Sequence, residues 1–129
     1  MKKAGLIMLC GLLAAVFIGW SQSASARPQY KKEHDAKYKD SKIAGALKEA
    51  KCNACHYGKS KKNRNDYGKA LEKSGLSKKS YTELKSDKPA LAKHVKEALE
   101  KVLKEKNADG ETFGDRIKAG KLPGTAPKE

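Results

Sequence analysis

Cys52-Asn53-Ala54-Cys55-His56 is the segment on which the interpretation of this chain rests, because two cysteines stand three apart and a histidine directly follows the second. This spacing is the attachment pattern of a c-type haem. Each thiol can add to one vinyl group of the porphyrin, and the histidine can then bind the iron from the proximal side. The segment therefore predicts one covalently bound haem c, attached through Cys52 and Cys55 and ligated by His56.

Three other uses of these residues are weaker. A structural zinc site normally takes its ligands from two separated pairs, whereas the other histidines, His34 and His94, stand alone and no second cysteine pair follows. A thioredoxin-like redox pair expects a preceding strand, but the residues before Cys52 have a helical pattern. A disulfide between Cys52 and Cys55 would close a tight, strained loop and gain little stability. Haem attachment is therefore favoured.

The first residues of the chain have the features of an export signal. Two lysines precede an apolar or small stretch over residues 4–20, and Ala24-Ser25-Ala26 matches an A-x-A cleavage site. We predict that residues 1–26 are a cleavable signal peptide and that the mature protein is periplasmic or otherwise exported. Covalent haem attachment takes place outside the bacterial cytoplasm, so the two predictions agree. An uncleaved membrane anchor is the alternative.

The chain is small and strongly basic. Its 129 residues carry 29 Lys and Arg against 15 Asp and Glu, a formal net charge of +14. Without the signal peptide roughly one hundred residues remain, enough for one domain with a small core. We assign residues 27–40 to an N-terminal segment with a short helix, 41–120 to the haem c domain and 121–129 to a flexible tail.

The positive charge indicates an acidic redox partner protein or a weak association with an anionic membrane surface. Basic residues are spread through every segment and are not interleaved with aromatic residues, so nucleic acid is not an expected partner. A plain solvated lysine surface is the simpler interpretation, and it is compatible with steering toward a redox partner. The mature form is not expected to be embedded in a membrane.

The hydrophobic pattern of the mature chain is helical, with no sustained two-residue alternation. A first short helix is predicted where three side chains recur every four residues on one face: Tyr30, His34 and Tyr38. Asp40 or Ser41 can cap a second helix, which continues into Cys52.

Further short helices are predicted after the motif, with the following capping residues: Asp66, Ser77 or Ser80, Asp87 and Thr112. The longest of them runs from Asp87 to about Lys106. We therefore predict an all-α fold, a small bundle of about four to five short helices around one covalently attached haem.

The second axial ligand of the iron decides what such a haem does. Both methionines, Met1 and Met8, lie in the predicted signal peptide, so the His/Met ligation of many electron carriers is unavailable. His94 is the first candidate for a distal ligand, because it lies at the edge of the apolar stripe of the longest helix: Leu91, Val95, Ala98 and Val102. His34, flanked on its face by two tyrosines, is the weaker distal candidate.

Both histidines also have a structural interpretation. His94 could be a boundary residue hydrogen-bonded to backbone or water, and His34 could be a half-buried ring packed beside Tyr30 and Tyr38. A lysine, a tyrosine, water or a vacant position are further alternatives for the distal side. The sequence leaves these alternatives open.

The motif, the apolar N-terminus and the helical pattern together resemble those of small exported monohaem c-type cytochromes. Cys52, Cys55 and His56 match the attachment pattern in full, and the wider context is similar at Asn65-Asp66-Tyr67-Gly68 and over residues 113–124. The resemblance implies a cytochrome c-like bundle in which the cysteines hold the haem and the histidine is its proximal ligand. The chain departs from the usual His/Met electron carriers in its lack of a distal methionine.

The function that this resemblance implies is the transfer of single electrons between redox partners, not enzymatic catalysis. The alternative is a gas-binding (NO/CO) or sensing haem c protein with an open or displaceable distal site, which the missing methionine favours. A peroxidase-like enzyme would need polar acid–base groups on the distal side and is not expected.

Overall fold

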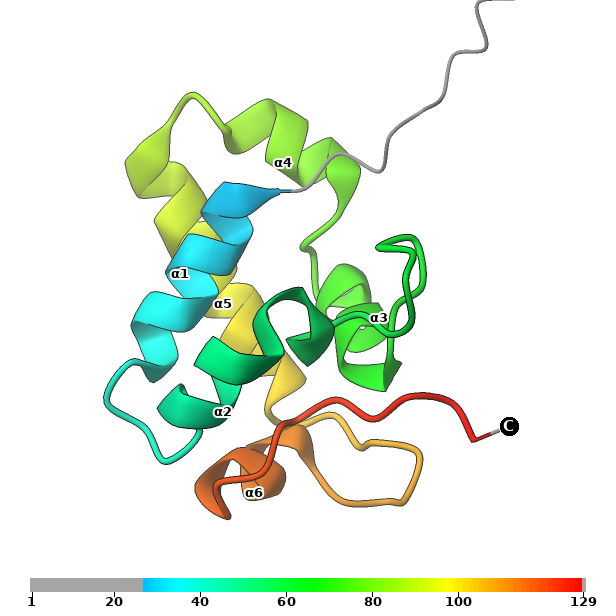
Figure 1. Ribbon diagram of the computed structural model, residues 1–129. Helices are drawn as coiled ribbons and strands as arrows, with labels where there is room; N and C mark the ends of the chain where they lie inside the picture. The colour runs from blue at the N-terminus through cyan, green and yellow to red at the C-terminus, as the bar shows by residue number, and fades with distance from the viewer. Residues whose placement is uncertain (1–26, 129) are drawn as a thin grey trace, which may run out of the picture.

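Figure 1 shows the computed structural model of the protein, which describes residues 27–128. These residues form six α-helices and one 3-10 helix: α1 (Pro28–Tyr38), α2 (Ala44–Ala50), η1 (Lys51–Ala54), α3 (Asp66–Lys73), α4 (Lys78–Leu84), α5 (Lys88–Val102) and α6 (Phe113–Lys118). The all-α prediction is confirmed. The six α-helices occupy the six segments in which caps and periodicity predict helices, so the expected total of about four to five was too low. The predicted signal peptide, 1–26, lies outside the described residues.

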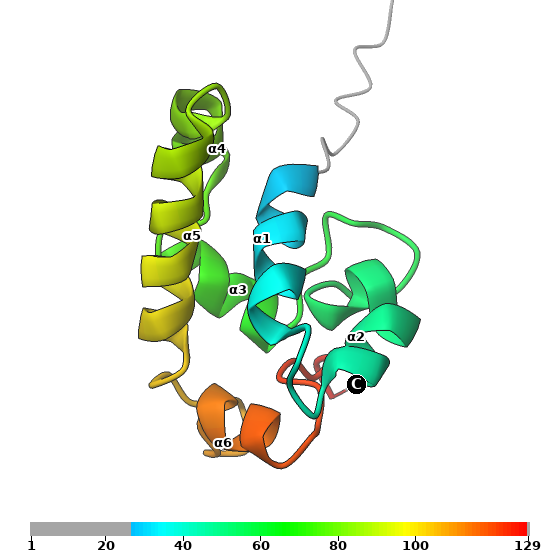
Figure 2. The same cartoon turned by 90° about the vertical axis from the view of Figure 1, so that its left-hand side faces the viewer.

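α5 is the centre of the fold. It is the longest helix described, and α1, α3 and α4 all pack against it, with α1 beside it in both views (Figure 1 and Figure 2). Five side chains of α5 are buried: Leu91, Val95, Ala98, Leu99 and Val102. The predicted apolar stripe is thus confirmed, and each fully buried Val or Leu contributes about 1.5–3 kcal/mol. Over residues 27–128, no helix combines the length and apolar character that crossing a bilayer requires.

Aromatic side chains close the core on the side of α1 that faces α3. Tyr67 and Phe113 are almost completely buried, with ring centroids 5.2 Å apart. His34 is also buried and lies between the rings of Tyr38 and Tyr67, at centroid distances of 5.0 and 5.8 Å. Tyr30 pairs instead with Tyr81, at 5.2 Å. The predicted face of α1 is therefore buried, but Tyr67 replaces Tyr30 as the second aromatic neighbour of His34.

The predicted caps are correct for three helices: Ser77 with Ser80 at α4, Asp87 at α5 and Thr112 at α6. At α3 the cap is Asn65 and not the predicted Asp66, because the Asn65 side-chain oxygen accepts from the Gly68 amide at 2.9 Å. α2 begins after Ile43 without a side-chain cap. The Ser41 hydroxyl donates instead to the Tyr38 carbonyl at the end of α1, at 2.7 Å.

α5 ends at Val102 and not near Lys106. The carbonyls just after α5 accept hydrogen bonds from the first residues of α6, and not from amides of a continuing helix. The Gly114 amide donates to the Leu103 carbonyl and the Phe113 amide donates to the Glu105 carbonyl, both at 3.0 Å. A Cβ on Gly114 would lie 2.9 Å from that Leu103 oxygen, so this glycine permits the close approach.

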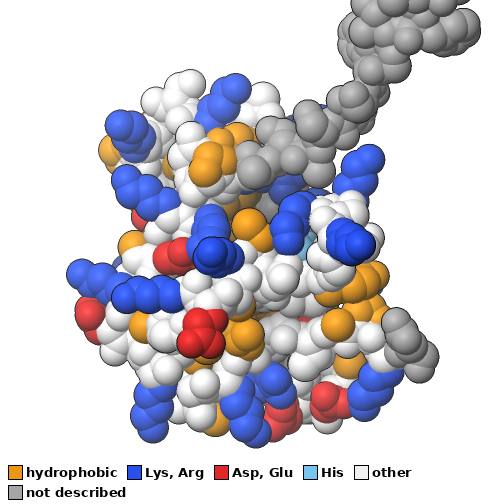
Figure 3. All heavy atoms as spheres, viewed as in Figure 1, with side chains coloured by type: hydrophobic (Ala, Val, Ile, Leu, Met, Phe, Trp, Pro, Cys, Tyr) orange, Lys and Arg blue, Asp and Glu red, His pale blue; other side chains and the backbone are white. Residues whose placement is uncertain are grey.

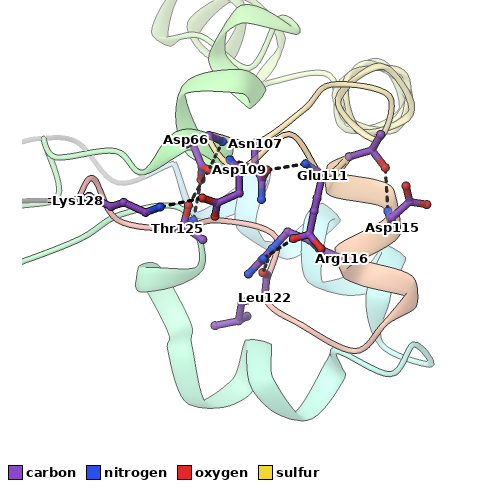
Figure 4. Close-up of polar contacts among 11 residues, drawn as sticks. Asp66, Asn107, Asp109, Glu111, Asp115, Arg116, Leu122, Thr125 and Lys128 are labelled. Atoms are coloured by element: carbon purple, nitrogen blue, oxygen red, sulfur yellow. Dashed lines mark hydrogen bonds and ion pairs between the residues drawn. The ribbon is translucent and has the colours of Figure 1, made fainter.

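The segment predicted as a flexible tail, 121–129, is anchored over residues 122–125. Pro123 is fully buried, and the Leu122 carbonyl accepts from the Arg116 guanidinium at 3.0 Å. The amide and hydroxyl of Thr125 both donate to the Asp66 carboxylate, at 2.7 and 2.8 Å (Figure 4). Residues 126–128 are exposed. The prediction was wrong for 122–125 because these bonds join segments far apart in the sequence.

Candidate haem-attachment site

The Cys52–His56 segment lies where α2 breaks into a tighter turn. Lys51 ends α2 with φ at +51°, a value that non-glycine residues rarely adopt. The amides of Cys55 and His56 both donate to the Cys52 carbonyl, at 3.2 and 3.1 Å. Side chains three residues apart eclipse one another in a 3-10 turn. Cys52 and Cys55 therefore lie at the two ends of one tight turn.

The two cysteines differ in environment. Both are free thiols, Cys52 is exposed and Cys55 is half-buried. Burial raises the pKa of the Cys55 thiol to about 12, against a smaller lowering by the charge of Lys31. A reactive redox pair needs an accessible thiolate with a lowered pKa. Cys55 does not supply such a thiolate, and its neutral thiol is compatible with a permanent thioether.

His56 is oriented by the loop that follows it. Its Nδ1 lies 3.0 Å from the Asn63 carbonyl oxygen, which can only accept, so Nδ1 carries the proton and Nε2 has the free electron pair. Burial lowers the pKa of His56 below the ordinary 6.5, and the positive charges of Arg64 and Lys61 act in the same direction. The imidazole is thus neutral at pH 7. A neutral ring fixed through Nδ1 is the usual form of a metal-binding histidine.

Residues 57–64 form the loop that supplies this carbonyl. The Tyr57 amide also donates to the Asn63 carbonyl, at 3.3 Å, and His56 and Arg64 form an isolated antiparallel bridge. The Lys61 ammonium reaches back to the Asn53 side chain at 2.8 Å. The basic run is therefore folded against the motif, and its backbone sets the direction of the His56 ring.

Asn65 holds the motif from the other side. Its amide donates to the Cys55 carbonyl at 3.0 Å, and its side-chain Nδ2 donates to the Ala54 carbonyl at 3.1 Å. The same side chain caps α3, and only 3% of the residue is exposed. One buried asparagine therefore satisfies two carbonyls of the motif, through its backbone amide and its side-chain Nδ2, and one orphan amide of the helix, through its side-chain oxygen. We call this set of bonds the Asn65 clamp.

Two glycines allow the clamp to close. A Cβ on Gly68 would lie 2.2 Å from the Cys55 carbonyl oxygen, and a Cβ on Gly124 would lie 2.3 Å from the Asn65 side chain. The first turn of α3 and the end of the chain can approach this closely only without side chains. Gly68 and Gly124 thus allow the first turn of α3 and the end of the described chain to support the motif.

His34 lies on the motif side of the molecule. It is 6% exposed, its Nδ1 lies 3.3 Å from the Asp35 carboxylate and its Nε2 lies 3.1 Å from the Tyr67 hydroxyl. The Asp35 carboxylate can only accept, so Nδ1 carries the proton and Nε2 accepts from Tyr67. Tyr67 precedes Gly68, which lies against the Cys55 backbone. The structure therefore brings the weaker distal candidate close to the attachment residues.

His94 is bonded to the turn between α3 and α4. Its Nε2 donates to the Gly75 carbonyl at 2.9 Å, and this oxygen also accepts from the Ser77 amide at 2.9 Å and the Ser80 hydroxyl at 2.6 Å. Gly75 has φ at +120°, and a Cβ there would lie 3.2 Å from the His94 ring. His94 thus fastens α5 to the turn between α3 and α4. This is the boundary histidine bonded to backbone that the sequence offered as the alternative to a ligand.

The donor set suits covalent haem: two thiols on one turn and one neutral imidazole with Nε2 available. A groove of about 820 Å³ lies elsewhere, between α3 and α5, and charged residues such as Lys73, Glu97 and Lys104 line it. Sequence reasoning missed Asn63 and Asn65, which orient His56 and clamp the motif. The preference of asparagine for helix caps is the one signal that could have identified Asn65. No protein-family model, curated protein or solved structure matches this chain.

Proposed function

We propose that this protein is a monohaem c-type cytochrome that transfers single electrons between redox partners outside the cytoplasm. The observation that carries the proposal is the state of His56. Its Nδ1 proton is bound to the Asn63 carbonyl, and its Nε2 is free directly after a turn that carries the exposed Cys52 thiol and the half-buried Cys55 thiol. A histidine that served only as a surface side chain would need neither the fixed tautomer nor the adjacent cysteine pair.

The residues of the motif have separate tasks in this proposal. At Cys52 and Cys55 a carbon–sulfur bond forms at one carbon of a vinyl group, and the thiol proton is transferred to the other carbon. When bound, the haem supplies the one-electron ferric–ferrous couple. His56 provides Nε2 as the proximal ligand, and the Asn63 carbonyl keeps the ring in one orientation. The Asn65 clamp keeps the turn from moving when the charge of the site changes.

The surface charge supports an acidic redox partner. Lysine and arginine side chains are spread over the face seen in Figure 3, with fewer acidic ones among them. The loop beside the motif adds three exposed lysines: Lys59, Lys61 and Lys62. Such a surface steers an acidic partner toward the site, and screening by salt weakens the steering. Reduction by the partner is therefore expected to slow as ionic strength rises.

The direct test is expression of the full chain in a bacterium with a c-type haem maturation system. We expect red protein in the periplasmic fraction, an N-terminus at Arg27, a c-type pyridine haemochrome spectrum and haem that stays with the protein in acid acetone. Cys52→Ser/Cys55→Ser is the matched control and is expected to be colourless after extraction. Wild-type protein that is colourless, or that releases its haem into the acetone, would contradict the proposal.

A gas-binding or sensing haem c protein is the second candidate. The specific observation in its favour is that no methionine follows Met8, while His34 and His94 already have hydrogen-bond partners in this structure. Carbon monoxide added to the reduced protein separates the two functions. An immediate and complete spectral shift favours gas binding, whereas an unchanged spectrum favours electron transfer.

A further inference from the structure

We infer that His34 is the distal ligand of the haem iron and that its Nε2, which accepts from the Tyr67 hydroxyl in the haem-free fold, is released to the iron when haem is attached. This inference rests on the proposed function and deepens it. It reverses the order in which the sequence ranks the two free histidines, because the packing of α1, α3 and α5 gives them different neighbours.

The first argument is position. Tyr67 is the first-turn residue of α3 next to Gly68, and Gly68 lies against the Cys55 backbone. The Cys55 thiol is close enough to Tyr67 to affect its pKa, which burial raises well above the usual range. The Cys55 thiol is also close to the charges of Lys31 and Asp35, the neighbours of His34 on α1. Tyr67 therefore joins His34, through its hydroxyl, to the turn of α3 that lies against the Cys55 backbone.

The second argument is that the hydrogen bonds around His34 are incomplete. The Tyr38 hydroxyl is buried and has no hydrogen-bond partner among the described residues. Tyr38 is 5% exposed and its ring lies 5.0 Å from that of His34. Buried hydroxyls without a partner are rare, and each one needs an explanation. A missing polar or metal group on this side of α1 is such an explanation.

The third argument is that ligation would complete these bonds. If His34 Nε2 binds iron, the Tyr67 hydroxyl loses its present acceptor. Tyr38 flanks the same imidazole from the other side, so its unpaired hydroxyl is available to the released Tyr67 hydroxyl. The bond between His34 and Tyr67 is then exchanged for one between two tyrosines. His34 Nδ1 keeps its bond to Asp35, which fixes the tautomer that leaves Nε2 free for a metal.

The fourth argument is that His94 has no comparable freedom. Its Nε2 is bound to a backbone carbonyl that also accepts two other donors in the turn between α3 and α4. To bind iron through Nε2, His94 would have to break its hydrogen bond to the Gly75 carbonyl. It would also have to leave the turn in which Gly75, having no side chain, lets the ring lie close to the backbone. His94 is therefore a structural residue and serves as the matched control.

The test compares three variants with the wild type in the mature holoprotein: His34→Ala, His94→Ala and Tyr67→Phe. Covalent haem is first measured in each by pyridine haemochrome after acid acetone, and then the ferric absorption and EPR spectra are recorded. We expect a low-spin wild type, a high-spin His34→Ala that returns to low spin with added imidazole, and a wild-type spectrum in His94→Ala. Tyr67→Phe is expected to keep covalent haem and a low-spin spectrum, because the Tyr67 hydroxyl no longer bonds His34 Nε2 once that nitrogen is on the iron.

Two results separate this inference from the proposed function. Wild-type protein without covalent haem overturns both. Covalent haem with a low-spin signal that survives in His34→Ala, or with a high-spin wild type, overturns only the role of His34. If His34→Ala does not fold, His34→Met replaces it: the methionine must change the ligand-field spectrum from that of two histidines to that of histidine and methionine, and an unchanged spectrum overturns the inference.

Discussion

The apolar face of α5 and the Asn65 clamp hold the molecule together in different ways. The five buried side chains of α5 contribute through burial alone, and all are 3% exposed or less. In the motif, by contrast, only Ala54 is buried, and its carbonyl and that of Cys55 are fixed by two directed bonds from Asn65. Burial tolerates substitutions that keep the volume, whereas directed bonds do not. Stability and the geometry of the motif are therefore separable properties of this fold.

The largest effect is expected in the α5 core. Leu99 is 1% exposed, and Leu99→Ala removes its contacts and leaves a cavity. We expect the free energy of unfolding to fall by about 3 kcal/mol in urea denaturation. The variant should still attach haem at temperatures where it is folded, because no bond of the clamp involves Leu99. Loss of haem attachment by fully folded Leu99→Ala protein would show that the two regions are not separable.

Gly68→Ala is expected to disturb the motif and not the α5 core. The new Cβ would lie 2.2 Å from the Cys55 carbonyl oxygen. A Cβ is fixed to its backbone, so the backbones of residues 68 and 55 would have to move apart. We expect a loss of about 2–3 kcal/mol in stability together with a low yield of covalent haem. Gly45→Ala is the matched control, because a Cβ there meets nothing within 4 Å and the helix gains about 0.5 kcal/mol. Normal haem yield in Gly68→Ala would contradict the close contact.

Asn65→Ala removes the clamp without adding a clash. The cap of α3 is lost, and the Ala54 carbonyl is left without its donor, so stability is expected to fall by about 2 kcal/mol. Asn65→Asp sharpens the comparison, since the carboxylate can still cap α3 but cannot donate to Ala54. Hydrogen exchange should show faster opening of the motif amides in both variants. Protection of α3 itself should decrease only in Asn65→Ala.

The smallest effect is expected from pH. Burial lowers the pKa of His34 below 6.5, so between 6.5 and that lower value the unfolded chain binds a proton that the folded chain does not. In haem-free Cys52→Ser/Cys55→Ser protein, stability should be constant above pH 6.5 and decrease as pH falls below it. Introducing His34→Gln should reduce this dependence and leave the part that the lowered pKa of His56 contributes. A stability that rises on acidification would mean that His34 is protonated in the fold.

Local features of this structure were predictable from sequence, and long-range ones were not. The caps at Ser77, Asp87 and Thr112 follow from residues within one turn. At α3, two adjacent residues can each cap a helix, and the choice of Asn65 depends on Thr125, which takes the Asp66 carboxylate from far along the chain. Tertiary contacts of this kind leave no local pattern.

The candidate site shows the same division. The cysteine spacing predicts the attachment residues, and the period of four predicts that His34 lies on the buried face of α1. Neither pattern predicts that Tyr67, 33 positions away, bonds to His34, or that His94 bonds to Gly75. Packing gives the two histidines different partners, and the proposal that His34 is the distal ligand depends on that difference.

The bonds between Thr125 and Asp66 have a consequence for biogenesis. Thr125 follows Asp66 by 59 positions, and Gly124 covers the Asn65 side chain. A polypeptide that is synthesised or translocated from its amino terminus presents Cys52 and Cys55 well before Thr125 emerges. If the chain carries haem c as proposed, enzymes that attach the porphyrin would meet the two thiols before Gly124 and Thr125 bind to Asn65 and Asp66, and these contacts would then fix the attached product.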